Sequence, residues 1–138
     1  MARLRSRPAP SDVPITASVL VVDDDLVVGR SLCRALNAML PGFRVELVPS
    51  GEAALDWLRQ NPCDVIVTDL DMGRLSGSAL LQTLASEFPR IIRIVHSSRK
   101  EALESRELRQ LIHDSLEKPA RPTHIAELIT RHVGSTSK

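Results

Sequence analysis

The sequence predicts a doubly wound α/β fold, in which a five-stranded parallel sheet carries helices on both faces. Short β-branched runs alternate five times along the chain with longer segments whose apolar residues recur at helical spacing. Strands that are joined through helices of about 10–15 residues pair in parallel through right-handed crossovers. Because the strands are apolar almost throughout, we expect helices to cover both faces of the sheet.

Each strand is justified by β-branched residues that lie between turn signals. The first and third strands contain only Val, Leu and Ile, the second alternates apolar and polar residues, and the fourth is apolar except for one arginine. The fifth is very short. The predicted strands are residues 19–22, 43–48, 65–67, 91–95 and 115–116.

Each helix is justified by one apolar face and by residues that start or stop it. The Pro-Gly pair at 41–42 ends the first helix, Ser50 caps the second, and the Asn-Pro pair at 61–62 stops it. The Ser-Gly pair at 76–77 opens the third helix, and Pro89 stops it. The predicted helices lie around residues 32–39, 50–58, 76–84, 101–112 and 123–133.

The composition limits the class of protein. The 138 residues are 43% apolar and 25% charged, which fits one folded domain. A net charge of +1 and 2% aromatic residues speak against nucleic-acid binding through bulk charge or base stacking. No apolar run approaches the roughly 20 residues that cross a membrane. The two cysteines, Cys33 and Cys63, are too few for a disulfide scaffold or a Cys-based zinc site and favour a cytoplasmic protein.

The chain is expected to divide into three parts. Residues 1–17 mix Pro, Arg, Ser and Ala without an apolar period and are predicted to form a disordered tail. Residues 18–133 hold all the predicted strands and helices and form the single domain. Residues 134–138 are predicted to be a flexible C-terminal end.

Polar side chains follow four of the predicted strands, at the point where each strand ends. Ligands of open parallel sheets bind beyond this carboxyl edge, so we expect these side chains to form a site. They are Asp23, Asp24 and Asp25 after the first strand, Asp69 and Asp71 after the third, Ser97 after the fourth and Lys118 after the fifth.

The chemistry of these groups points to phosphoryl transfer. Clustered carboxylates repel one another unless a hard cation such as Mg²⁺ or Mn²⁺ neutralises them. A lysine and a serine hydroxyl nearby suit a phosphoryl group, which also binds such cations. Since an aspartate can act as the nucleophile and form an acyl phosphate, we expect phosphoryl transfer onto an aspartate.

Four motifs occur in order at the predicted strand ends. They are Val19-Leu-Val-Val-Asp-Asp-Asp25, Asp64-Val-Ile-Val-Thr-Asp-Leu-Asp-Met72 with Gly77, Ile94-Val-His-Ser97, and Leu116-Glu-Lys-Pro119. Together they give the chain a strong resemblance to the receiver domain of two-component response regulators, the CheY-like family. The resemblance implies the flavodoxin-like (βα)5 fold and a regulatory domain that accepts a phosphoryl group and switches a protein-interaction surface. It does not imply an enzyme in the usual sense.

The resemblance also assigns the metal ligands. It implies that Asp23 and Asp24, together with Asp69 and the backbone carbonyl of Asp71, hold Mg²⁺ or Mn²⁺. The acidic triplet leaves a second register open, in which Asp24 and Asp25 form the pair. We prefer the first register because the apolar strand ends directly before Asp23.

The resemblance assigns the phosphoryl site as well. It implies that Asp69 is the phospho-acceptor, that Ser97 bonds a phosphoryl oxygen, and that Lys118 pairs with the phosphoryl group. The peptide bond between Lys118 and Pro119 is expected to be cis, as is common in the family.

By the same resemblance, the partners are a sensor histidine kinase or phosphotransfer protein upstream and an output domain or protein partner downstream. A homodimer is an option in this family. We expect no direct nucleic-acid contact and no membrane contact from these residues.

Two departures from the family concern the switch. The position where the family often has Tyr or Phe is Ser115, so the aromatic half of the usual switch is absent. Asp71 and Arg99 occupy variable positions that influence phosphoryl lifetime in this family. His96 precedes Ser97, but strand alternation points it to the other face of the sheet. We interpret Gly77 as a residue of the helix start.

Two alternatives stay open. The first is an adaptor with the receiver fold that signals without phosphorylation. Ser115 favours this alternative, whereas the complete set of Asp, Ser and Lys residues argues against it. The second is a phosphohydrolase, because the sequence from Asp69 to Asp71 also resembles the first motif of haloacid-dehalogenase-type enzymes. That family normally carries this motif near the chain start.

Overall fold

The computed structural model of the chain describes residues 16–72 and 75–136. The predicted tail falls almost entirely on residues 1–15, which lie outside the described residues, as do 137–138. The described residues contain five strands, which are β1 (Ala17–Val22), β2 (Phe43–Val48), β3 (Val65–Thr68), β4 (Ile92–Ser97) and β5 (Asp114–Glu117). They contain six helices, which are α1 (Leu26–Met39), α2 (Gly51–Leu58), α3 (Gly77–Glu87), α4 (Lys100–Leu103), α5 (Arg106–Arg109) and α6 (Pro122–Thr136).

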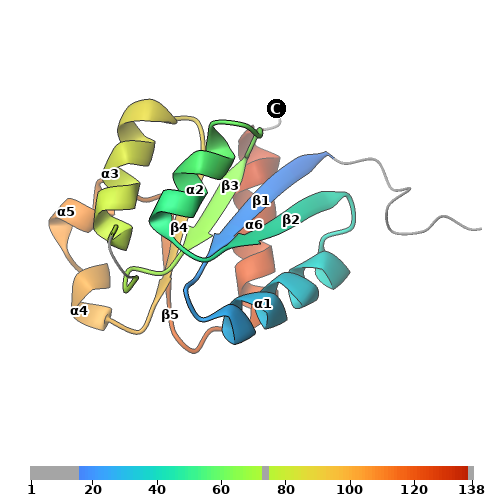
Figure 1. The fold of residues 1–138 in the computed structure, drawn as a ribbon. Helices are drawn as coiled ribbons and strands as arrows, with labels where there is room; N and C mark the ends of the chain where they lie inside the picture. The colour runs from blue at the N-terminus through green and yellow to red at the C-terminus, as the bar shows by residue number, and fades with distance from the viewer. Residues whose placement is uncertain (1–15, 73–74, 137–138) are drawn as a thin grey trace, which may run out of the picture.

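The strands form one parallel sheet in the order β2-β1-β3-β4-β5 (Figure 1). Every strand pair is parallel, which confirms the predicted fold class. The order of the sheet reverses between β1 and β3, because the chain builds outward from β1 first to one side and then to the other. This is the place where an open α/β sheet leaves a crevice at its carboxyl edge.

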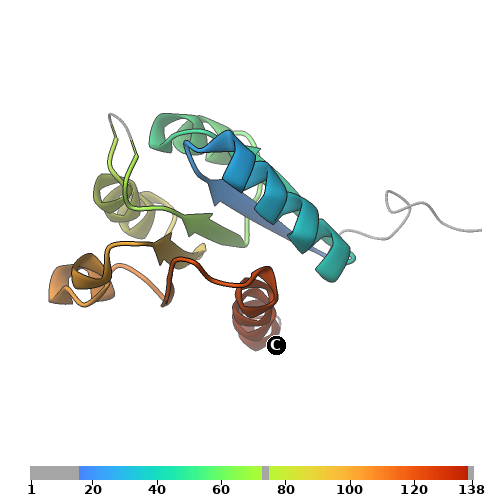
Figure 2. The same cartoon turned by 90° about the horizontal axis from the view of Figure 1, so that it is seen from below.

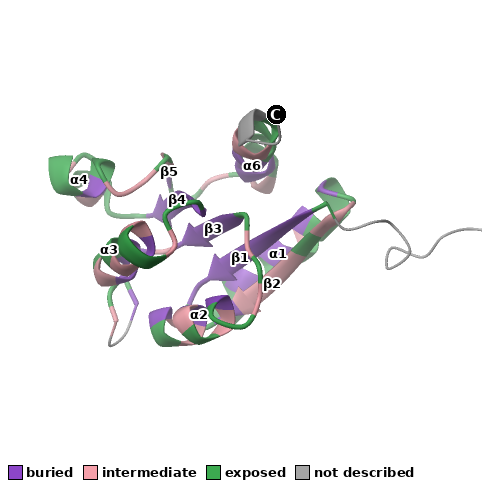
Figure 3. Cartoon of the chain, turned by 90° about the horizontal axis from the view of Figure 1, so that it is seen from above, coloured by how far each residue is buried: buried purple, intermediate pink, exposed green. Residues whose placement is uncertain are grey.

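Helices cover both faces of the sheet, as the apolar strands predict (Figure 2). On one face, Val19 and Val21 pack with Leu36 of α1 and Ile129 of α6. On the other face, residues of α2, α3, α4 and α5 pack against Leu20 and the neighbouring strands. The three central strands β1, β3 and β4 are therefore buried, while the edge strands β2 and β5 are only partly covered and the helices keep an exposed outer side (Figure 3).

The first three helices begin at side-chain caps. The carboxylate of Asp25 accepts the backbone N–H of Val28 at the start of α1. Ser50 caps α2 as the sequence predicts, and Ser76 caps α3 in the same way. These caps fix where each helix leaves the carboxyl edge of the sheet.

The predicted single helix over residues 101–112 is wrong. The structure breaks it into two short helices, α4 and α5. The Ser105 hydroxyl accepts the backbone N–H of Leu108 at 3.3 Å, so it caps a new helix at that point. Serine competes for backbone N–H groups in this way, which an apolar periodicity does not register. The last helix also runs three residues beyond its predicted end, to Thr136.

Both cysteines are free thiols. Burial raises the pKa of Cys33 to about 11 and that of Cys63 to about 12, so both stay protonated at neutral pH. Within residues 16–72 and 75–136, no helix is both long enough and apolar enough to span a membrane.

Candidate functional site

The carboxyl ends of four strands bring the predicted polar residues to one edge of the sheet. Asp23 follows β1, Asp69 follows β3, Ser97 ends β4 and Lys118 follows β5. Backbone hydrogen bonds extend the strand pairing to this edge, from Asp69 N to the Val22 carbonyl at 3.2 Å and from Lys118 N to the Ser97 carbonyl at 2.8 Å. The positions of these side chains are therefore set by the sheet itself.

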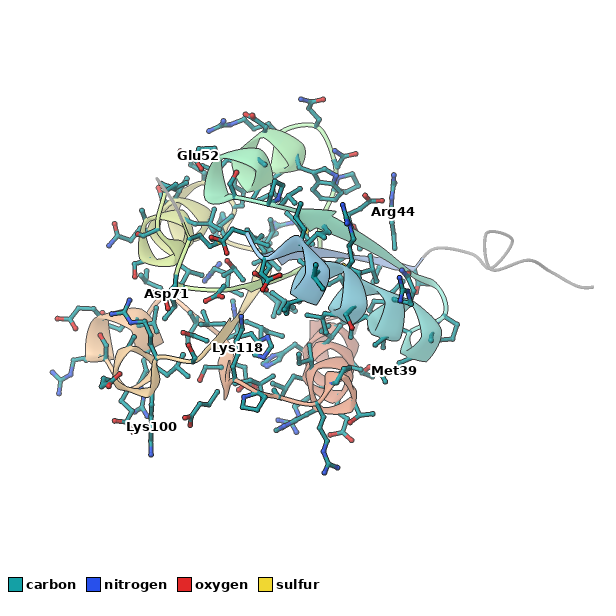
Figure 4. The ribbon with its side chains drawn as sticks, turned by 60° about the horizontal axis from the view of Figure 1, so that its bottom comes forward. Met39, Arg44, Glu52, Asp71, Lys100 and Lys118 are labelled. Carbon is teal, nitrogen blue, oxygen red and sulfur yellow. The ribbon has the colours of Figure 1, made fainter. Side chains whose placement is uncertain are left out.

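The Lys118 side chain, labelled in Figure 4, places its ammonium between two carboxylates. Its Nζ donates to Asp69 Oδ2 at 2.8 Å and lies 3.6 Å from Asp23 Oδ2. The three side chains are largely buried, with exposed fractions of 23% for Lys118, 12% for Asp69 and 7% for Asp23. Burial alone would lower the pKa of Lys118, but the hydrogen bond and charge attraction from Asp69, with help from Asp23, outweigh it and raise that pKa.

Each carboxylate is also held by one backbone N–H group. Asp69 Oδ1 accepts the N–H of Asp71 at 3.0 Å, and Asp23 Oδ1 accepts the N–H of Asp25 at 2.9 Å. The second oxygen of each carboxylate is thereby directed toward Lys118. This leaves the two aspartates oriented side by side, with their mutual repulsion balanced by one cation.

Ser97 and Arg99 form the β4 side of the site. Ser97 is fully buried, and its Oγ accepts the N–H of Arg99 at 3.0 Å. A hydroxyl that accepts one hydrogen bond can still donate another to an added anion. The Arg99 guanidinium in turn donates to Asp71 Oδ1 at 2.9 Å, an ion pair that the spacing of the two residues in the sequence does not predict.

Gly77 packs directly under Asp69, which gives it a role beyond that of a helix start. A Cβ atom at this glycine would lie 2.5 Å from the Asp69 carbonyl oxygen and 2.6 Å from the Cα of Leu70. The Gly77 N–H also donates to the Leu70 carbonyl at 3.1 Å. The close approach therefore sets the path of the backbone immediately after β3.

The predicted metal ligands are only partly assembled. Asp23 and Asp69 come together, while Asp24 is exposed and the Asp71 side chain pairs with Arg99. Among residues 16–72 and 75–136, no group of three or more His, Cys, Asp and Glu side chains stands ready to hold a metal. Even so, the adjacent carboxylates of Asp23 and Asp69, with Asp24 next to Asp23 in the sequence, are oxygen donors of the kind that Mg²⁺ prefers. The donor set fits a hard cation that shares these oxygens with Lys118.

The His96 side chain lies toward α1, on the face of the sheet that strand alternation predicts, although it still interacts electrostatically with Lys118, Asp69 and Asp23. It is nine-tenths buried and lines a pocket of about 320 Å³ with Val27 and Val28 of α1 and with residues that follow β5. Burial lowers its pKa, so the imidazole is neutral at pH 7. The peptide bond between Lys118 and Pro119 is cis, which confirms that prediction.

Comparison with known proteins agrees with this geometry. The sequence profile of the response regulator receiver domain matches residues 19–130. The chain belongs to the response regulator receiver domain family. This receiver is 43% identical over 68 residues to response regulator MprA of Mycobacterium sp. (strain KMS), a match that covers 49% of the chain and 29% of the relative. A match to response regulator MprA of Mycobacterium bovis (strain BCG / Pasteur 1173P2) has 39% identity over 72 residues, 52% of the chain and 30% of the relative. The match therefore spans less than a third of the length of these relatives.

Solved receiver structures share the fold. A response regulator receiver protein from Pseudomonas putida is 28% identical, with a TM-score of 0.78 over 86% of this chain and 99% of that one. The receiver domain protein from Clostridium thermocellum, at 21% identity, shares the fold with a TM-score of 0.79 over 88% of this chain and 98% of that one. The chain is thus a regulatory receiver of two-component systems rather than a typical enzyme, and such domains generally use Mg²⁺ for phosphorylation.

Proposed function

We propose that this receiver accepts a phosphoryl group on Asp69 from a phosphohistidine of a sensor histidine kinase or a phosphotransfer protein. The hydrogen bond from Lys118 to Asp69, at the edge where β1, β3, β4 and β5 end, carries this proposal. It marks Asp69 as the aspartate whose added charge a buried cation can meet. We also infer that the reaction takes place in the cytoplasm, where free thiols persist.

In the proposed reaction, a carboxylate oxygen of Asp69 attacks phosphorus as the bond between phosphorus and the imidazole nitrogen of the donor breaks. The imidazole keeps the electron pair of the broken bond, and an oxygen–phosphorus bond forms on Asp69. Lys118 pairs with the charge of the new phosphoryl group, and the Ser97 hydroxyl donates to one of its oxygens. The product then biases a two-state surface toward the form that a downstream partner binds.

The metal belongs to the same proposal. Asp23, Asp24, Asp69 and the Asp71 carbonyl would hold Mg²⁺ or Mn²⁺, which neutralises negative charge around the phosphoryl group when it is bound. Because Lys118 contacts two of these carboxylates, its single positive charge offsets part of their negative charge before a metal binds.

The first test is intact-mass measurement after treatment with acetyl phosphate and Mg²⁺. We expect the wild-type chain to gain one phosphoryl mass and Asp69→Asn to gain none. An adduct that persists in Asp69→Asn would contradict the assignment. If the wild type gains no adduct, the phosphorylation-independent adaptor is favoured instead, and multiple turnovers on phosphomonoesters would favour a phosphohydrolase.

A second prediction concerns the register of the acidic triplet. We expect Asp24→Ala to abolish Mg²⁺-dependent labelling, because the metal would lose one of its carboxylates. Asp25→Asn is expected to label normally, since asparagine also caps a helix and α1 stays intact. Normal labelling of Asp24→Ala, or loss of labelling in Asp25→Asn, would show that the preferred register is wrong.

A third prediction concerns the phosphodonor. Three exposed apolar residues begin α1 next to the site, namely Leu26, Val27 and Val28, and Val27 is 77% exposed. A protein donor must bring its phosphohistidine to Asp69, so this patch is well placed for it to contact. We expect Val27→Asp to slow phosphotransfer from the cognate kinase at least about tenfold, a change that corresponds to about 1.4 kcal/mol of transition-state stabilisation. Labelling by acetyl phosphate should not change.

Met39 supplies the control for this prediction. It lies at the other end of α1 and is 39% exposed, so Met39→Asp adds the same charge away from the site. We expect this variant to accept phosphoryl groups from kinase and acetyl phosphate alike. If Val27→Asp and Met39→Asp slow phosphotransfer from the kinase equally, the first turn of α1 has no special part in binding the donor.

A further inference from the structure

A closed ring of hydrogen bonds joins the ends of β3, β4 and β5. Asp71 N donates to Asp69 Oδ1, and the Arg99 guanidinium donates to Asp71 Oδ1. Arg99 N donates to Ser97 Oγ, and Lys118 N donates to the Ser97 carbonyl. Lys118 Nζ closes the ring on Asp69 Oδ2 at 2.8 Å. Every group proposed to meet the phosphoryl group belongs to this ring, together with Arg99, which has no part in the phosphoryl transfer described above.

Arg99 is held differently at its two ends. Its backbone N–H is bound to the fully buried Ser97. Its guanidinium pairs with Asp71 in solvent, where the two side chains are 58% and 48% exposed. Exposed ion pairs contribute little to stability, so this pair is easily exchanged for a better partner.

Phosphorylation of Asp69 would supply that better partner. A phosphoryl group carries close to two negative charges and three acceptor oxygens, whereas the Asp71 carboxylate carries one charge. The planar guanidinium matches phosphate oxygens with two parallel hydrogen bonds. The same group would repel Asp71, whose N–H already lies 3.0 Å from Asp69 Oδ1.

We propose that Arg99 is a second phosphoryl-binding side chain, which Asp71 holds until Asp69 is phosphorylated. This inference rests on the proposed function. In the unphosphorylated form Arg99 pairs with Asp71, and in the phosphorylated form it moves to the phosphoryl group, so that Lys118 and Arg99 bind it from the β5 and β4 sides.

The move has a direct route to the surface. Arg99 is the N-cap residue of α4, and its side chain does not cap the helix. The helix is a single turn, separated from α5 by the cap at Ser105. Figure 4 shows Asp71 and Lys118 on the same side of the molecule as Lys100 of α4. A shift of Arg99 therefore displaces α4, which offers a readout in a chain with Ser115 in place of an aromatic residue.

The test uses beryllofluoride with Mg²⁺ as the phosphoryl mimic, titrated calorimetrically into the full chain. We expect Arg99→Gln to weaken binding about tenfold, the loss typical of one charge-assisted hydrogen bond. Asp71→Asn should strengthen binding because it releases Arg99, and this gain should vanish in the double variant. Arg109→Gln removes the same charge from exposed α5 and should bind as the wild type does.

A second readout follows the backbone. Hydrogen exchange of amides 100–103 is expected to change on phosphorylation by acetyl phosphate in the wild type and in Arg109→Gln, but not in Arg99→Gln. If Arg99→Gln takes up phosphoryl groups and binds beryllofluoride as the wild type does, the role of Arg99 is overturned while the proposed function stands. If the wild type takes up neither phosphoryl groups nor beryllofluoride, both the role of Arg99 and the proposed function are overturned.

Discussion

Replacement of Lys118 by methionine is expected to lower the free energy of unfolding at pH 7 by about 1–3 kcal/mol. Methionine keeps much of the apolar stem but leaves Asp23 and Asp69 facing each other without a cation. Removal of one partner from a fully buried pair costs about 3–5 kcal/mol. We expect less here because Lys118 is 23% exposed and water reaches the site.

The effect should depend on pH in a defined direction. The pKa of Lys118 is raised in the folded protein, because the hydrogen bond and charge of Asp69 outweigh burial. Its stabilisation is therefore fully present below the pKa of an unfolded lysine, about 10.4, and is lost as the pH rises through the raised value. The difference between wild type and Lys118→Met should persist from neutral pH to about pH 10 and shrink above it.

Urea unfolding at several pH values measures this effect, and Lys100→Met is the matched control. Lys100 is exposed on α4 and is not one of the site residues, so its variant should unfold as the wild type does. Mg²⁺ should stabilise Lys118→Met more than the wild type, because the metal no longer competes with the ammonium. Equal midpoints for Lys118→Met and the wild type at pH 7 would contradict this account of the site.

The sheet was predictable because its signals are local. Residues 19–22 and 65–67 are apolar throughout, as strands buried on both faces are. Because a helix separates each strand from the next along the chain, the strands pair in parallel. The prediction of a single helix over residues 101–112 was wrong because the periodicity of apolar residues indicates an apolar face and does not register a break in the helix. Ser105 was the available signal, since it is a good N-cap residue with a glutamate two positions later.

The site was predictable to the extent that strand ends decide it. Asp23, Asp69, Ser97 and Lys118 meet because each follows a parallel strand in the same sheet. The pair between Asp71 and Arg99 was not predictable, because two exposed loop residues 28 positions apart meet only through the path of their loops. Contacts of this kind depend on tertiary geometry, which spacing in the sequence does not encode.

Buried polar residues were missed for a similar reason. Arg93 interrupts an apolar strand and is 9% exposed, yet its guanidinium donates to the carbonyls of Leu111 at 2.7 Å and Ile91 at 3.0 Å. The backbone N–H of Arg93 also donates to His113 Nδ1. A charged residue inside a strand was the signal that could have found this anchor, which ties β4 to the segment before β5.

Replacement of Gly77 by alanine is expected to destabilise the domain by about 1–3 kcal/mol and to slow labelling of Asp69 by acetyl phosphate at least about tenfold. The new Cβ would lie 2.5 Å from the Asp69 carbonyl oxygen and 2.6 Å from the Cα of Leu70, and both are backbone atoms that cannot rotate away. The turn after β3 must therefore shift, and Asp69 loses its alignment with Lys118. The gain that alanine usually brings to a helix, about 0.5–1 kcal/mol, is too small to offset this.

Two other glycines calibrate the result. At Gly29 the nearest obstacle is the end of the Leu47 side chain at 2.7 Å, which can turn aside, so Gly29→Ala should cost less than Gly77→Ala. At Gly134, inside α6, nothing lies within 4 Å of the added atom, so Gly134→Ala should label as the wild type does and unfold at the same or a slightly higher urea concentration. Urea midpoints and labelling rates that fall from Gly134→Ala through Gly29→Ala to Gly77→Ala would show that the close backbone contact at Gly77 positions Asp69. Normal labelling of Gly77→Ala would refute that role, because the Asp69 carbonyl would then have moved without consequence for its side chain.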